Sequence, residues 1–281
     1  DAVVRGQEKC AGAWRQRLAL AAAAVAAKQA GRVEDEAALR DTVLLTRAGD
    51  DAGPAGRLCL AWRQLAARPA VDLLTEKNLA AVPEAFGYAG DGEAGADLVA
   101  ELRKLDAGAG TVEALTGAFA VAERHGFGRS VGAWLADALL ARRLGWTHAV
   151  PVLGTEATLG GAPARIRRSA TVSPAAGIET ESDRAKSLLA AQARAALRAI
   201  DLSAALGRRA DKLAAVAPKL RAKGAEAIVE RLLNEDALVV SRGDKTTGMS
   251  DRALRRLFDR LVELGAVREL SGRPTFRAYG L

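Results

Sequence analysis

Alanine-rich apolar runs recur along this sequence and constrain its fold more than any other feature. One of them, LALAAAAVAA at residues 18–27, consists of alanine and leucine with one valine, and the first two rank among the best helix formers. Aromatic residues make up only 4% of the chain, and β-branched residues come in short clusters. We therefore expect a mainly α-helical protein whose helices contact each other through small side chains. The run is flanked by Arg17 and Lys28 and falls short of the roughly 20 apolar residues that cross a bilayer, so no membrane span is predicted.

Local signals place several of these helices. A helix predicted at residues 10–29 ends before Gly31, and the acids at residues 34–36 occupy the first turn of the next helix. HGFGRS, at residues 125–130, is predicted to be the turn between two further helices. Near residue 200, apolar residues at helical spacing predict a face packed on the core, with the arginines in solvent. The predicted core face consists of Leu188, Leu189, Leu197, Ile200, Leu206, Leu213 and Val216.

Residues 248–281 contain a helix with both ends marked, followed by a hairpin. Ser250 is placed as the N-cap, and Gly265 as the left-handed residue after the last turn. The runs AVREL and TFRAYGL have strand composition, and SGRP between them supplies turn residues, which places Arg273 near the tip of a β-hairpin. This order predicts a winged-helix module, in which DALVVSRGDKTTG occupies the place of the second helix of a helix-turn-helix. The apolar face of the marked helix consists of Leu254, Leu257, Phe258, Leu261 and Leu264.

The length of 281 residues allows two domains, each with a core of its own. Small polar residues, Gly and Pro without a helical period predict a loop or linker between them. We therefore divide the chain into an all-helical domain at 1–153, a flexible loop or linker at 154–182, a basic helical segment at 183–222 and the winged-helix module at 223–281. The chain starts with Asp1 rather than Met, and we expect residues to precede it.

Positive charge is concentrated in the C-terminal third, although the net charge of the chain is only +7. Residues 184–222 hold 9 Lys/Arg against 2 Asp/Glu, whereas residues 1–160 hold 18 against 20. Residues 223–281 hold 11 against 9, a net charge of +2. A polyanionic partner should therefore meet the C-terminal third.

The arginines at the start of the marked helix predict contact with double-stranded DNA. A helix fits the major groove, arginine pairs bidentately with guanine, and a wing arginine reaches phosphate or the minor groove. The predicted DNA-binding residues are Arg252, Arg255, Arg256, Arg260, Arg273, Arg277 and Lys245. An accessory basic surface is predicted at Arg194, Arg198, Arg208, Arg209 and Lys212. Acidic residues in the same module favour the alternative that it docks on a protein.

Catalytic signatures give no competing prediction. His125 and His148 are the only histidines and lie in no HExxH motif, and GxSxG does not occur. GFGRSVG has GxGxxxG spacing without a preceding strand, so it is not a dinucleotide loop. Cys10 and Cys59 lack ligand spacing and are expected to be buried thiols in a reducing cytoplasm. We predict no metal site, no cofactor and no enzymatic activity, with a cryptic site in the helical domain as the remaining alternative.

Several stretches also carry a resemblance to a known family. With GAWRQRLAL, EDEAALRD, GPAGRLCLAWRQLA, APKLRAKGA and the C-terminal run from MSDRALRR onward, the chain resembles an uncharacterised bacterial family known as a domain of unknown function, family 1403. The resemblance implies a protein of alphaproteobacterial chromosomes or plasmids. Its tail is similar to winged helices that follow Fic-type domains, but the Fic signature HxFxxGNGR is absent, so AMPylation is not implied.

The sequence thus favours a bacterial, cytoplasmic DNA-binding regulator of transcription or of a plasmid. Its N-terminal helical domain would form a homodimer or receive a protein partner. The alternatives are an interaction protein whose winged helix docks on another protein and, less favoured, an enzyme.

Overall fold

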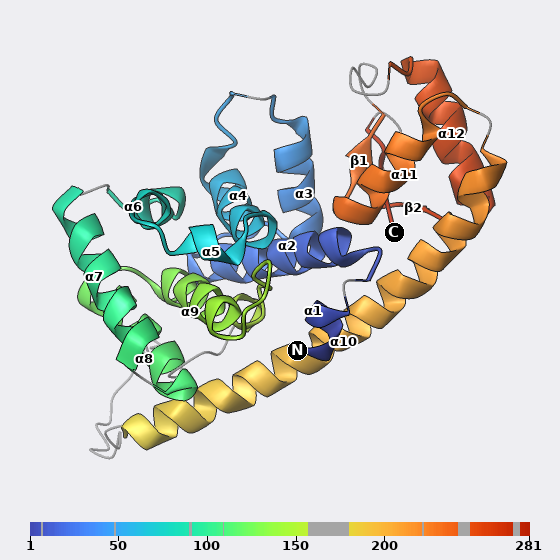
Figure 1. The fold of residues 1–281 in the computed structure, drawn as a ribbon. Coiled ribbons are helices and arrows are strands. Elements are labelled where there is room, and N and C mark those ends of the chain that lie inside the picture. The colour runs from blue at the N-terminus through green and yellow to red at the C-terminus, as the bar shows by residue number, and fades with distance from the viewer. Residues whose placement is uncertain are drawn as a thin grey trace, which may run out of the picture.

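The chain folds into a mainly helical protein, as predicted, with one small antiparallel sheet (Figure 1). The structure is a computed structural model. It describes residues 1–6, 8–47, 49–89, 92–108, 110–156, 180–220, 222–240, 248–271 and 276–281. In this part of the chain, no helix combines the length and the apolar character needed to cross a bilayer.

The N-terminal helices surround the alanine-rich run, which lies in the buried helix α2. Because alanine side chains are small, α4 and the turn η1 approach α2 closely. Residue 10 is the N-cap of α2, and Gly31 follows it with a positive φ of 72°, as the sequence predicts. The elements of this part are α1 (Ala2–Arg5), α2 (Ala11–Gln29), α3 (Glu36–Leu45), α4 (Gly53–Ala67), α5 (Ala70–Leu73), α6 (Glu76–Ala85), α7 (Gly92–Gly108), α8 (Thr111–Arg124), α9 (Arg129–Arg143) and η1 (Leu153–Thr155).

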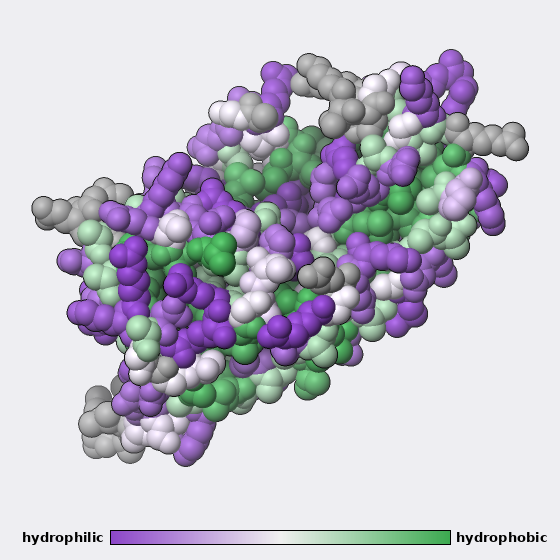
Figure 2. Space-filling model, in the orientation of Figure 1, coloured by the Kyte–Doolittle hydropathy of each residue, from purple (hydrophilic) through white to green (hydrophobic). Residues whose placement is uncertain are grey.

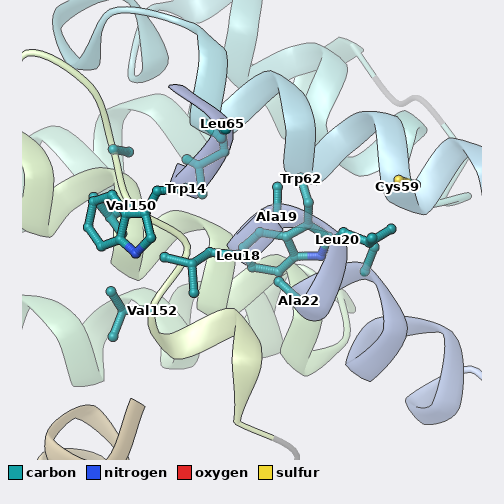
Figure 3. Close-up of a cluster of buried hydrophobic side chains, with 14 of the residues drawn as sticks. Trp14, Leu18, Ala19, Leu20, Ala22, Cys59, Trp62, Leu65, Val150 and Val152 are labelled. Atoms are coloured by element: carbon teal, nitrogen blue, oxygen red, sulfur yellow. The ribbon is translucent and has the colours of Figure 1, made fainter. Parts of the chain in front are cut away.

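Tryptophans are among the largest buried side chains of the core, and Figure 3 shows Trp14 and Trp62 within it. Trp62 of α4 is fully buried against α2, and a Cβ on Gly154 would lie 2.2 Å from its ring, so only glycine lets η1 pass there. Trp14 of α2 donates a hydrogen bond from Nε1 to the carbonyl oxygen of Ala199 at 2.8 Å. This bond ties the N-terminal helices to the long helix α10.

The basic segment is dominated by one continuous helix, α10 (Glu181–Val216), of 36 residues. At 1.5 Å per residue it is about 54 Å long, and it runs from α8 past α2 to the C-terminal module (Figure 1). Thr180 caps it by accepting a hydrogen bond from the amide of Asp183. The buried face is built mainly from small residues and leucines: Leu188, Ala191, Ala195, Ala199, Ser203, Leu206, Ala210 and Leu213.

The prediction of which residues of α10 face the core is partly wrong. Leu189, Leu197 and Ile200 are 46%, 64% and 48% exposed. The alanines, not these larger residues, meet α2 and α8, because small side chains allow the helix axes to approach. The helix therefore carries two apolar stripes, one on the core and one on the opposite face.

The C-terminal module follows through η2 (Ala217–Lys219). It contains α11 (Ala225–Asn234), β1 (Leu238–Val239), α12 (Asp251–Glu263), β2 (Arg268–Glu269) and β3 (Ala278–Gly280). The two predicted strands pair, and β1 joins them on the other side of β3, giving the antiparallel order β1-β3-β2. The sequence did not predict β1. Tyr279 of β3 stacks on Phe258 of α12 with ring centroids 4.5 Å apart, so the sheet packs directly on the helix.

The predicted ends of the marked helix are confirmed. The Ser250 side chain accepts a hydrogen bond from the amide of Ala253, and Gly265 has a positive φ of 65°. One continuous hydrophobic cluster includes residues from α2 to the C-terminal Leu281. The division into domains at residues 153 and 182 stays a prediction.

Candidate nucleic-acid interface

The first two turns of α12 present three arginines to solvent. Leu254, Leu257, Phe258 and Leu261 are buried on one side of the helix. Arg252, Arg255 and Arg256 fall on the other side and are exposed. Among the described residues, none of these three arginines has an ion-pair partner. They form a cationic patch on a rigid helix, which we call the α12 arginine patch.

The other predicted DNA-binding arginines of the module have carboxylates beside them. Arg260 bonds to Glu263 at 3.0 Å, and Arg277 lies 3.9 Å from both Asp259 and Glu269. The pKa of the Arg277 guanidinium is raised, first by its interaction with the Tyr279 side chain and then by Glu269 and Asp259. These carboxylates reduce the positive potential that the two arginines offer to a phosphate.

Two predicted residues, Lys245 and Arg273, lie outside the described residues. The predicted hairpin tip and the segment before Gly248 therefore contribute no geometry to this site.

The predicted accessory surface separates into two parts. Arg194 and Arg198 of α10 both bond to Glu156, whose side chain is only 5% exposed. Each arginine is about half exposed, so one end of each holds Glu156 while the rest faces solvent. Their contact with Glu156 fastens the end of the N-terminal helices to α10.

Arginines cluster at the other end of α10, near the module. Burial lowers the pKa of Arg209 first, and the positive charges of Arg268, Arg17 and Arg208 lower it further. Arg268 belongs to β2 and is exposed, so a strand of the module lies close to the arginines of α10. Sequence reasoning missed Arg268, although it stands in the predicted strand AVREL. Lys212 is also exposed on α10.

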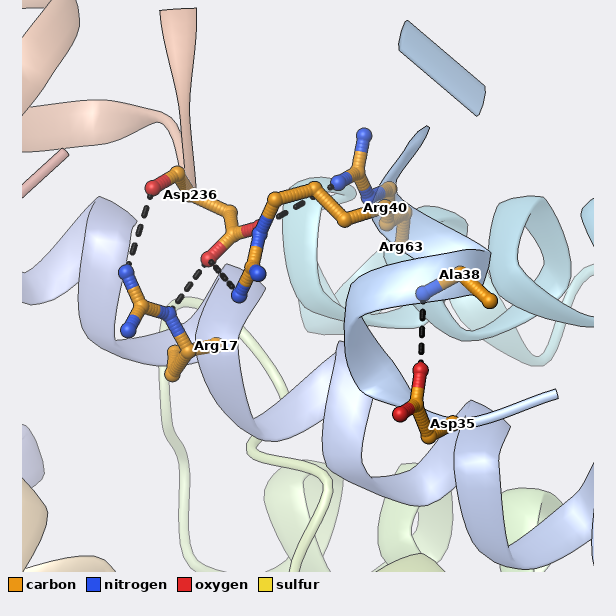
Figure 4. Close-up of polar contacts among 6 residues, drawn as sticks. All are labelled: Arg17, Asp35, Ala38, Arg40, Arg63 and Asp236. Atoms are coloured by element: carbon orange, nitrogen blue, oxygen red, sulfur yellow. Dashed lines mark hydrogen bonds and ion pairs between the residues drawn. The ribbon is translucent and has the colours of Figure 1, made fainter. Parts of the chain in front are cut away.

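A buried carboxylate fastens the module to the N-terminal helices (Figure 4). Asp236, between α11 and β1, has a side chain that is only 1% exposed. Arg17 of α2 and Arg40 of α3 donate hydrogen bonds to its two oxygens, the latter at 2.6 Å, and Arg63 of α4 lies 3.6 Å away. Arg17 also donates to the backbone oxygen of Asp236 at 3.2 Å. Three helices thus hold one residue of the module, and no motif in the sequence signals this.

Charge balance decides the ionisation of this carboxyl. Burial opposes the charged form of Asp236, but the three arginines outweigh it and hold its pKa below the ordinary value.

A glycine of α2 permits the close approach of α2 and α11 beside this cluster. A Cβ on Gly12 of α2 would lie 2.6 Å from the Cα of Asn234 at the end of α11. The orientation of the α12 arginine patch is therefore fixed relative to the N-terminal helices.

A pocket opens beside this cluster, between α2, α4 and the residues that follow α11. It has a volume of about 380 Å³. Its polar lining includes Gln16, Arg63, Gln64 and Asn234, and its apolar lining includes Leu60. This set can hold a polar molecule but contains no nucleophile with an activating base.

Other reactive side chains lie in structural settings. Cys10 and Cys59 are buried as predicted, and burial raises the pKa of both thiols, which makes them poor nucleophiles. His125 ends α8, as expected, and lies 3.3 Å from Glu101. Among the described residues, no group of three His, Cys, Asp or Glu side chains is arranged to hold a metal ion.

Comparison with family models matched the whole chain, residues 1–281, to the family described as "Protein of unknown function (DUF1403)". This confirms the family resemblance read from the sequence. Comparisons with curated proteins and with solved structures gave no match.

Proposed function

We propose that this chain, which belongs to the DUF1403 family over its whole length, binds double-stranded DNA through a C-terminal module of the winged-helix type. The α12 arginine patch carries the proposal. Three exposed arginines on the first two turns of a capped helix are suited to enter a major groove, where arginine recognises guanine edges and phosphates.

The order of elements in the module supports this assignment. A helix, a strand, a second helix and a two-stranded hairpin follow each other, and the hairpin is completed by the first strand into a three-stranded sheet. The sheet packs on α12 from the side opposite to the patch, through Phe258 and Tyr279. The arginines are therefore held on a rigid support and need no folding step to meet DNA.

The balance of charge predicts modest affinity. Arg260 and Arg277 have acidic neighbours, so among the described residues of the module the patch of Arg252, Arg255 and Arg256 supplies most of the positive charge that no carboxylate opposes. Neutralising three phosphates gives a slope of about −2.7 in a plot of log K against log salt concentration. We propose a regulator of transcription or of a plasmid in the bacterial cytoplasm, a setting in which buried thiols stay reduced.

The test is fluorescence anisotropy with random-sequence duplex DNA at several salt concentrations. A variant with Arg252, Arg255 and Arg256 changed to Ala should lose most of the affinity and most of the salt slope. A matched control changes Arg57, Arg103 and Arg124, which are exposed on the N-terminal helices, to Ala. The control removes the same charge and should keep the slope. Equal losses in both triple variants would show that net charge, not the patch, governs binding.

A second candidate is docking of the module on a protein. The carboxylates of Asp259, Glu263 and Glu269 favour it, because they repel a DNA backbone and suit a partner of mixed charge. Absence of DNA binding at low salt, together with a stoichiometric partner that the α12 triple variant fails to retain, would establish this alternative.

A further inference from the structure

The outer face of α10 carries an apolar stripe that the rest of the described chain does not cover. Leu197 is 64% exposed and Ile200 is 48% exposed. Ala193 and Ala204 are exposed as well. Figure 2 shows hydrophobic surface along the lower edge of the molecule, where α10 runs in Figure 1.

Helix geometry places these side chains in one line. Successive residues are 100° apart, so positions 193, 197, 200 and 204 fall within about 60° of one another. Their spacing of four, three and four residues is the spacing of a coiled-coil seam. The seam points away from the buried face, which carries Ala195, Ala199 and Leu206. A long helix with apolar stripes on both sides is suited to pack on a second partner.

The charges beside the seam indicate what this partner is. Asp183, Arg194, Asp201 and Lys212 lie along one flank, in the order acid, base, acid, base. In an antiparallel pair of α10 helices, a twofold axis near Leu197 brings this flank against its own copy.

In this antiparallel arrangement, opposite charges of the two helices face each other. Residues whose numbers add to about 395 then face each other across the axis. Arg194 faces Asp201 of the partner subunit, and Asp183 faces Lys212 of the partner subunit. At the two ends of the seam itself, Lys186 lies near Asp211 of the partner subunit. By symmetry each pair occurs twice, so the pattern is complementary to itself.

We propose that α10 forms an antiparallel homodimer through this outer seam. A parallel pair would set Arg194 and Asp201 about 10 Å apart along the axis and give the flank charges no opposite charge across the interface. The face from Asp183 to Lys212 is about 45 Å long and one helix diameter, about 10 Å, wide. Two such faces bury about 900 Å², which is below the roughly 1,200 Å² of stable interfaces and therefore predicts a weak, reversible dimer. The proposal stands independently of DNA binding.

Sedimentation velocity of the full chain from 1 to 100 μM should show a monomer–dimer equilibrium. Leu197→Glu should weaken it at least about 100-fold, because it removes apolar contact and places two carboxylates near the axis. Val33→Glu is the control, since Val33 is 94% exposed away from α10 and the dimer should persist. A monomeric parent chain at 100 μM, or equal loss in both variants, would overturn the proposal.

Charge reversal tests the register. Lys186→Glu should weaken the dimer, and adding Asp211→Lys to the same chain should restore it. A double variant weaker than the single one would contradict the antiparallel pairing.

Disulfide crosslinking gives a second, independent readout. Leu197→Cys lies near the axis and should crosslink under mild oxidation. Ala215→Cys lies on the same face, but in this register its two copies are about 50 Å apart and should not crosslink. The natural cysteines are buried and do not interfere. Crosslinking through position 215 would show a parallel pair, and its absence at position 197 would rule out the seam.

Discussion

Changing Asp236 to Asn should test whether one buried carboxylate docks the C-terminal module. The substitution keeps the shape of the side chain but removes the charge that Arg17, Arg40 and Arg63 share. The oxygen of Asn can keep one of the hydrogen bonds, whereas its amide group would face guanidinium donors. All three guanidinium groups are largely buried, with side chains 8% to 19% exposed. Breaking a buried charge cluster in this way costs about 3–5 kcal/mol.

Urea unfolding followed by circular dichroism at pH 7 measures this loss. Asp51→Asn is the control. Asp51 is exposed and its ion pair with Arg57 is long, at 4.0 Å, so this substitution should change the free energy of unfolding by less than about 1 kcal/mol. A loss below about 1 kcal/mol for Asp236→Asn would refute the reasoning, since it would mean that the arginines are solvated without the carboxylate.

The same variant has a predicted pH signature. Because the pKa of Asp236 is lowered in the folded protein, its stabilisation is complete above the unfolded pKa of about 3.9 and is lost as pH falls through the folded value. The difference in stability between the parent chain and Asp236→Asn should be full at pH 7 and should shrink below about pH 4. A difference that stays constant down to pH 2 would contradict the ionised state of Asp236.

Three further predictions concern single positions. Gly12→Ala should destabilise the protein by about 2 kcal/mol in urea, because the new Cβ would overlap the backbone of Asn234, whereas Gly108→Ala meets no neighbour within 4 Å and should be tolerated. Burial raises the pKa of Asp137, in α9, to about 7, so this carboxyl carries a proton in the folded state between about pH 4 and 7, where it is ionised in the unfolded chain. The parent chain should lose up to about 4 kcal/mol relative to Asp137→Asn as pH rises through that window, and urea titrations at pH 4.5 and 7.5 check the sign. Ser250→Ala should cost about 1 kcal/mol by removing the cap of α12, measured as a lower thermal midpoint.

Local sequence signals predicted the helices well because helix ends depend on neighbouring residues. The cap at Ser250 and the left-handed conformation of Gly265 could both be predicted, because each depends on the backbone conformation and the side chain at a single position. The turn between α8 and α9 was readable for the same reason. Two-residue β1 was not, because its pairing with β3 depends on residues about 40 positions away.

The stripe on α10 shows where periodicity fails. Leucine at helical spacing indicates an apolar face but does not say what the face meets. Ala195 and Ala199 had weaker hydrophobicity than Leu197, yet they are the buried ones, because the closeness of α2 selects small side chains. The Asp236 cluster was hidden for a related reason. Its members come from three helices and from the segment between α11 and β1, and each looks like an ordinary surface charge in the sequence.

Docking and recognition fall on different residues of the same module, so they can be separated by experiment. The α12 arginine patch is exposed and contributes little to folding, so its substitution should change DNA binding at nearly constant stability. The side chain of Asp236 is buried and bonded to arginines, so its substitution should change stability and alter binding only through the position of the module. If both substitutions reduced DNA affinity in proportion to lost stability, the arginines would be structural and the module would have no specific role in recognition.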